Sequence, residues 1–168
     1  MADKFIQHDS VGGFREVEAA DAGGAGNEGK VVALDSTGRL DATMMPTGVG
    51  AETVNVPAFG ALANGDFVNV FNDAGTMKAR KADASTAVAP ANGFVLADVN
   101  SGETATVYWS GLNGNLSGLT PGPMYLSTTP GTATHIAPST AGNIVQKLGT
   151  AVNDTVVNFD PKEPILLA

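Results

Sequence analysis

Apolar and polar residues alternate with a period of two along most of the chain beyond residue 50, a pattern typical of half-buried β-strands. In Thr76–Lys81, for example, Met77 and Ala79 alternate with charged side chains. The strands predicted in this way are Glu52–Pro57, Asp66–Asn72, Thr76–Lys81, Gly93–Val99, Glu103–Trp109, Met124–Leu126, Ile144–Val145 and Val156–Phe159. We therefore expect an all-β module, folded as an antiparallel β-sandwich or β-barrel.

Turn-forming dipeptides separate the predicted strands. Proline precedes glycine at Pro121–Gly122 and at Pro130–Gly131, and Asn64–Gly65 is a further tight-turn pair. Proline fixes φ, and glycine accepts the positive φ that such turns require. The 21 glycines and 9 prolines of the chain fall in turns rather than in one low-complexity block. We therefore expect short connections, including a hairpin that runs from Phe94 to Trp109.

Residues 1–49 lack a sustained period and differ from the rest of the chain. Phe14–Ala22 has room for only one or two helical turns, which are marginal without packing, and Lys30–Leu34 is predicted to form a short strand. We expect residues 1–49 to be an extended N-terminal arm and linker, ordered by contacts outside its own domain; a disordered terminus is the alternative. Pro46 favours extended geometry at the preceding residue, which suits a boundary with a module over residues 50–168.

A motif of turn and core residues closes the chain. Its members are Gly118, Leu119, Thr120, Pro121, Gly122, Tyr125, Leu126, Ser127, Pro130, Gly131, Val145, Gln146, Gly149, Ala151, Phe159 and Pro161. In its spacing the motif resembles the C-terminal module recurrent in bacteriophage structural proteins, namely capsid decoration (cement) proteins, head fibres and tail fibres.

A second motif lies in the middle of the chain. Its members are Leu62, Gly65, Asp66, Val68, Val70, Gly93, Phe94, Val95, Gly102, Glu103, Val107 and Gly111. It resembles the small β-domain of phage capsid cement proteins. The preceding segment from Val32 to Pro46 is similar to the linker that joins an N-terminal attachment segment to a β-module in phage fibre and head proteins.

The resemblance implies a structural virion protein that decorates and stabilises a bacteriophage capsid by binding across neighbouring major capsid subunits. It further implies a homotrimer on the outer surface of the phage head, with the β-module as a protruding knob. The expected capsid-attachment residues are Phe5, Ile6, Phe14, Leu40, Met44 and Met45. The alternative is a head or tail fibre module that binds a host-surface glycan, although the chain lacks the long repetitive or coiled-coil shaft that such fibres usually need.

Charged residues are sparse, at 15% of the chain against about 25% in typical soluble domains. Between residues 84 and 146 only Asp98 and Glu103 are charged. This region is either a neutral surface coated with Ser, Thr and Asn or a surface buried against copies of the chain, because interface cores are depleted of charge. The expected subunit-interface residues are Tyr108, Trp109 and Tyr125; a sugar-stacking platform is the alternative for these aromatic side chains.

The formal net charge of −8 argues against nucleic acid as a partner, because nucleic-acid binding requires clustered Lys and Arg. The one basic cluster, Lys78 with Arg80 and Lys81, is interpreted as the solvent face of a strand. No cysteine is present, so neither disulfides nor thiolate metal sites contribute. No signal peptide is recognised, and no segment approaches the roughly 18 apolar residues needed to span a bilayer. We therefore expect no membrane partner.

Candidate chemistry is scarce in this sequence. Residues 24–30 match both GxGxxG and GxxxxGK, but a phosphate site needs a strand before and a helix after the glycines, and this segment is interpreted as a linker. His8 and His135 lie far apart, and Ser110 lacks the preceding glycine of a nucleophile elbow. We expect no catalytic residues, no metal site and no cofactor, and hence a protein that is not an enzyme.

Overall fold

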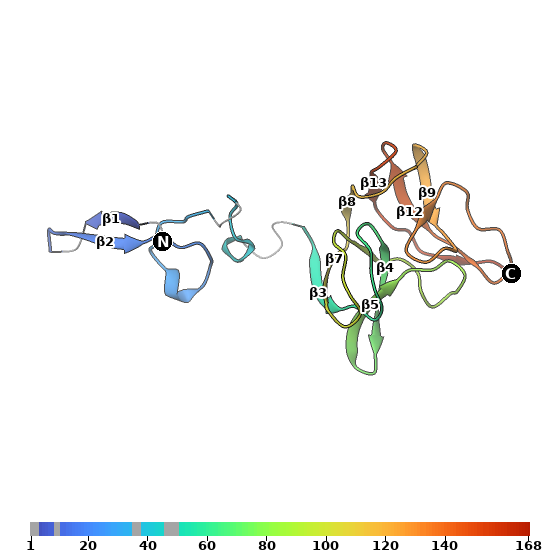
Figure 1. Ribbon diagram of the computed structural model, residues 1–168, viewed down its shortest axis with the longest axis horizontal. Helices are drawn as coiled ribbons and strands as arrows, with labels where there is room; N and C mark the ends of the chain where they lie inside the picture. Colours follow the sequence, from blue (N-terminus) through green and yellow to red (C-terminus); the bar gives the residue numbers. More distant parts are fainter. Residues whose placement is uncertain (1–3, 9–10, 35–37, 46–50) are drawn as a thin grey trace. The chain divides into compact units, whose positions relative to one another are not determined.

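The computed structural model describes residues 4–8, 11–34, 38–45 and 51–168, and every sheet in it is antiparallel. The chain divides into two compact units, an N-terminal unit (Met1–Gly50) and a C-terminal unit (Ala51–Ala168). The expected all-β fold is confirmed: strands dominate the described residues, in which helical structure is confined to two short 3₁₀ turns (Figure 1). The boundary expected after residue 49, with Pro46 before it, falls on residues 46–50, which lie outside the described residues.

The N-terminal unit is built on a β-hairpin. Strands β1 (Lys4–His8) and β2 (Phe14–Glu18) pair over their whole length. The 3₁₀ turns η1 (Ala25–Asn27) and η2 (Ala42–Met44) follow. The helical turns considered over residues 14–22 are therefore wrong, because cross-strand hydrogen bonds satisfy a backbone that a short unpacked helix would not stabilise.

The strand expected over residues 30–34 is also not formed. Val32 makes only an isolated parallel bridge to Ala20, with hydrogen bonds from Ala20 N to Val31 O and from Ala33 N to Ala20 O, both 2.8 Å. Three apolar residues in this segment remain exposed, namely Val31, Val32 and Leu34. An apolar run thus indicates a strand only where a neighbouring sheet is present to cover it.

The first half of the C-terminal unit is a five-stranded sheet that closes on itself. Its strands are β3 (Thr53–Pro57), β4 (Phe67–Asp73), β5 (Thr76–Lys81), β6 (Gly93–Val95) and β7 (Thr104–Tyr108), in the order β3-β7-β6-β4-β5. A parallel bridge between Ala58 and Ala79 joins the two ends, and the Phe59 N–H donates to Ala79 O at 2.7 Å. This bridge brings the two edge strands β3 and β5 together, and we call this half the barrel.

The β4–β5 hairpin of the barrel has a two-residue loop. Asp73 pairs with Thr76, and the intervening Ala74 and Gly75 both have positive φ, at 49° and 93°. Two such residues form a type I′ turn, whose twist matches that of the flanking strands. The register of β5, and with it the alternation predicted for Thr76–Lys81, is fixed by this turn.

The second half of the C-terminal unit is another five-stranded sheet. Its strands are β8 (Gly111–Asn113), β9 (Gly122–Leu126), β10 (Ala133–Thr134), β12 (Lys147–Ala151) and β13 (Val157–Phe159), in the order β10-β9-β12-β13-β8. A small additional pair consists of β11 (Ile144–Val145) and β14 (Ile165–Leu166). The register between β9 and β12 shifts between Lys147 and Gly149. Gly149 has a φ of 145°, and a Cβ there would lie 1.9 Å from Asn158 O, so only glycine fits at this bulge.

Side-chain alternation divides the core of the C-terminal unit into two clusters. Val68, Val95 and Val107 point into the barrel, where they pack with further small apolar side chains. Phe67 and Phe94, the strand neighbours of Val68 and Val95, point the other way and pack against Phe159 of the second sheet. The sequence left a β-sandwich and a β-barrel open as alternatives. Each describes part of the unit, because the closed sheet packs with one face against a second sheet.

Candidate interaction surfaces

The N-terminal unit has almost no hydrophobic core. Of its residues whose side chains the structure describes, Ala20 alone is buried. Large apolar side chains are instead exposed, namely Ile6, Val11, Phe14, Val31, Val32, Leu34, Leu40 and Met45. Exposed apolar side chains normally mark an interaction site where they are contiguous.

The hairpin separates its side chains onto two faces. Directly paired residues share a face, so Phe5 and Val17 lie on one face and both are half-buried. The opposite face presents Ile6 and Phe14, which are 73% and 76% exposed. His8 packs edge-on against Phe14, with ring centroids 5.4 Å apart. This second face therefore exposes Ile6 and Phe14 beside charged side chains, including Lys4, which pairs with Glu16 at 2.9 Å.

The six predicted attachment residues all lie in the N-terminal unit but do not form one group. Ile6 and Phe14 share the exposed hairpin face, whereas Phe5 lies on the other face. Leu40, Met44 and Met45 follow in and around η2, where Met44 is half-buried. Four further apolar residues are exposed in this unit and were not predicted as attachment residues, namely Val11, Val31, Val32 and Leu34. The sequence feature that could have identified them is their apolar character in segments for which no pairing strand was predicted.

The three aromatic residues predicted to lie at a subunit interface are dispersed over the C-terminal unit. The Tyr108 ring stacks on Phe94, with centroids 5.4 Å apart and an interplanar angle of 21°. Tyr125 lies in β9 of the second sheet and pairs with Thr134. Trp109 is half-buried just after β7. Among the described residues, no ring contact joins any two of these three side chains.

The basic cluster of β5 is engaged within the fold. Lys78 pairs with Asp73 at 2.7 Å, and its Nζ lies 5.7 Å from the centroid of the Phe59 ring. The guanidinium of Arg80 lies over Phe71, 4.2 Å from the ring centroid. Arg80 Nε donates to Asn69 Oδ1 at 3.0 Å, and the same guanidinium donates to Val88 O. Lys81 pairs with the buried carboxylate of Asp66 at 2.9 Å. Lys78 and Arg80 therefore lie on the outer face of the β4–β5 hairpin, whereas Lys81 alternates onto the opposite face.

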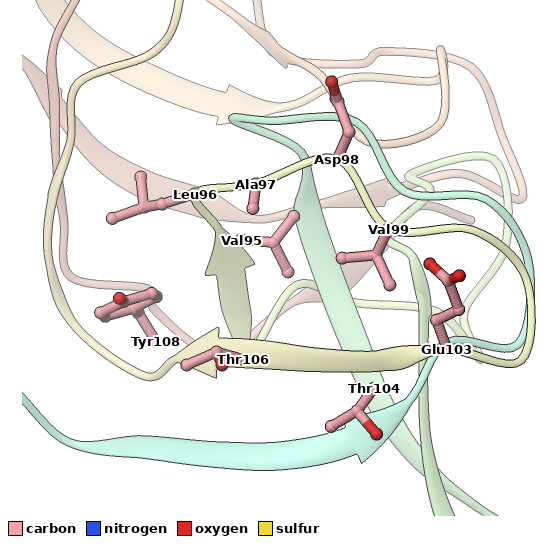
Figure 2. Close-up of a pocket in the computed structure, with 9 residues that line it drawn as sticks. All are labelled: Val95, Leu96, Ala97, Asp98, Val99, Glu103, Thr104, Thr106 and Tyr108. Carbon is pink, nitrogen blue, oxygen red and sulfur yellow. The ribbon is translucent and has the colours of Figure 1, made fainter.

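A groove lies where the barrel wall opens between β6 and β7. The two strands pair only at Phe94 with Tyr108 and at Val95 with Val107, whereas β3 pairs with all of β7. Beyond Val95 the chain leaves β7, and the resulting groove has a volume of about 300 Å³. Its lining residues are Val95, Leu96, Ala97, Asp98, Val99, Glu103, Thr104, Thr106 and Tyr108 (Figure 2).

Both carboxylates of the groove accept hydrogen bonds from nearby turns. Asp98 Oδ1 accepts the Asn64 N–H at 2.8 Å. Glu103 Oε2 accepts the backbone N–H and the side-chain Nδ2 of Asn100, both at 3.1 Å. No Lys, Arg or His is among the lining residues. The groove is therefore negatively charged, and its carboxylates are held in fixed positions.

Three features that the sequence raised can be located in the described part of the chain. Across residues 4–8, 11–34, 38–45 and 51–168, no three His, Cys, Asp or Glu side chains cluster to hold a metal ion. The glycine-rich residues 24–30 contain only the turn η1. No helix among the described residues is long and apolar enough to cross a membrane.

Comparisons of the chain with protein families, with curated proteins and with solved structures found no match.

Proposed function

We propose that this chain is a structural protein of a bacteriophage head, which decorates and stabilises the capsid by binding across neighbouring major capsid subunits. In this proposal the N-terminal unit is the attachment element and the C-terminal unit is a knob on the outer surface of the virion. The observation that carries the proposal is the contrast in burial between the units. One has two complete cores, and the other exposes most of its large apolar side chains.

The energetics of attachment follow from this exposed surface. Transfer of an exposed Ile or Phe side chain into an apolar contact is worth about 1.5–3 kcal/mol. Several such side chains, including Ile6 and Phe14, are needed to offset an association cost of about 4–15 kcal/mol. An isolated two-stranded hairpin is itself marginally stable. Binding to a capsid would therefore stabilise the N-terminal unit and the lattice together.

Decoration stabilises a capsid by linkage. A protein that binds the assembled lattice, and not free subunits, adds its own binding free energy to the stability of the lattice. As a homotrimer the protein would present three attachment units, and the first to bind raises the effective concentration of the other two. Modest affinity per unit then suffices for firm attachment.

The experiment that tests this proposal is a count of this chain in purified virions by quantitative mass spectrometry. We expect a ratio near one chain per major capsid subunit, because a decoration protein occupies a repeated site on the lattice. A few dozen copies or fewer per particle would contradict decoration and indicate a fibre instead. Absence from the particle would overturn any virion role.

A further inference from the structure

The open seam of the barrel leaves part of one strand without a neighbour. On its β3 side, β7 is paired from Thr104 to Tyr108. On its β6 side, pairing covers only Val107 and Tyr108. Thr104–Thr106 therefore form an internal strand edge that faces the groove shown in Figure 2.

The direction of the backbone groups follows from the alternation of hydrogen bonds along each strand. The Val95 N–H donates to Asp66 O at 3.0 Å, and Val95 O accepts the Gly65 N–H at 2.9 Å, so the backbone of Val95 is turned away from β7. Its neighbour Phe94 is therefore turned toward β7, opposite Tyr108. Every second residue before Tyr108, namely Thr106 and Thr104, is turned toward the groove in the same way.

We propose that this groove binds an extended, lysine- or arginine-containing peptide segment, which adds a short strand to β7. Strand addition uses main-chain hydrogen bonds for affinity and pockets for alternate side chains for specificity. Val95 and Val99 are buried in the barrel, so apolar contacts to one set of side chains come from Leu96, Ala97 and the Tyr108 ring. Asp98 and Glu103 offer opposite charge to a cationic residue, and no base on the groove competes with it.

The free edge is short, which limits what it binds. Three strand residues span about 10 Å, so the site takes the backbone of only a few residues. The charge of the groove makes a basic segment its preferred occupant over an acidic or a neutral one. This binding site is independent of the attachment surface of the N-terminal unit.

The test is a titration of the ¹⁵N-labelled full chain with two peptides, followed by NMR. The probe is acetyl-Val-Lys-Val-Lys-Val-amide, and the control peptide carries Glu in place of Lys. We expect the lysine peptide to shift the amide signals of Leu96, Thr104 and Thr106, and the glutamate peptide to leave them unchanged at the same millimolar concentration. Equal effects of both peptides, no shift at these amides, or shifts centred on another strand edge would overturn the proposal.

A matched pair of double variants tests the role of charge. In Asp98→Asn with Glu103→Gln, the remaining amide oxygens still accept from Asn64 and Asn100, so the turns are preserved while two charges are removed. We expect affinity for the lysine peptide to fall about fivefold to tenfold, since each exposed ion pair contributes only a few-fold. The control, Asp154→Asn with Glu163→Gln, removes two acids that do not line the groove. An equal loss in the control would show that net charge, and not the groove, attracts the peptide.

Discussion

The two units of this chain differ in how far they bury their apolar side chains. In the C-terminal unit, alternate residues of the same strands serve two cores, one inside the barrel and one between the sheets. In the N-terminal unit the hairpin is regular and fully paired, yet Ile6 and Phe14 on its outer face contact mainly solvent. Regular secondary structure is thus present in both units, and only one of them has a hydrophobic interior to stabilise it.

The motif that resembles phage structural modules belongs to the unit with an interior. Gly149 allows β12 to approach Asn158 O, Gln146 is a buried hydrogen-bonding side chain, and Phe159 fills the space between the sheets. These are requirements of folding. The difference between the units teaches that the residues of the two motifs are needed to fold the C-terminal unit, while the exposed apolar residues of the N-terminal unit are not needed to form a core.

The largest expected effect on stability comes from the contact between the two sheets. Phe159 is 1% exposed, and its ring centroid lies 5.5 Å from those of both Phe67 and Phe94. We expect Phe159→Ala to lower the free energy of unfolding by about 3–5 kcal/mol, because it leaves a cavity in a closed core. Urea unfolding followed by the fluorescence of Trp109 measures this unit. The control Phe59→Ala, at a 54% exposed site, is expected to cost less than about 1 kcal/mol.

A smaller effect is expected from a buried polar side chain. Gln146 accepts the Ala91 N–H at 2.7 Å and donates to Ala91 O at 2.8 Å and to Lys162 O at 3.0 Å. Gln146→Leu keeps the volume but leaves these backbone groups unpaired, so we expect a loss of about 2–4 kcal/mol in the same unfolding measurement. Lys147→Leu, at the exposed neighbouring position, is the control. A loss below 1 kcal/mol for Gln146→Leu would mean that water replaces the side chain.

The smallest effect on stability is expected in the N-terminal unit. Ile6→Ser with Phe14→Ser removes two side chains that bury little area, so we expect the unfolding of the C-terminal unit to change by less than about 0.5 kcal/mol. The same double variant should lose at least tenfold in co-sedimentation with capsids, because those side chains would be buried on binding. The control is Leu112→Ser with Ile136→Ser, two exposed sites of the C-terminal unit. Unchanged capsid binding by the hairpin variant would remove this face from the attachment surface.

The positions of many strands in the C-terminal unit could be predicted from local sequence. The pairings that close the barrel could not. The period of two and the adjacent turn place β5 at its observed bounds, Thr76–Lys81. The expected hairpin from Phe94 to Trp109 is confirmed by the pairing of β6 with β7. The strand predicted over residues 93–99 ends at Val95, because Val99 pairs with Leu62 instead. Such pairings depend on partners distant in sequence, which no local pattern specifies.

The candidate surfaces were predictable only in part. Apolar character identified Ile6 and Phe14, but which face each residue takes depends on the hairpin register. The groove beside β7 could not be predicted from the sequence. Residues 93–99 have the pattern of one continuous strand, but their pairing with β7 ends at Val95, and the groove forms there. Tyr108 looked like an interface residue, and the structure places its ring against Phe94.

The order of strands in the second sheet has a consequence for synthesis on the ribosome. Every member of the inner barrel cluster lies at or before Val107, whereas the cluster between the sheets requires Phe159. At translation rates of about 5–20 residues per second, the roughly 50 residues between these positions take about 3–10 s to emerge. During that interval Phe67 and Phe94 have no second sheet to cover them. We therefore expect a barrel that folds during synthesis to expose Phe67 and Phe94 until Phe159 has emerged.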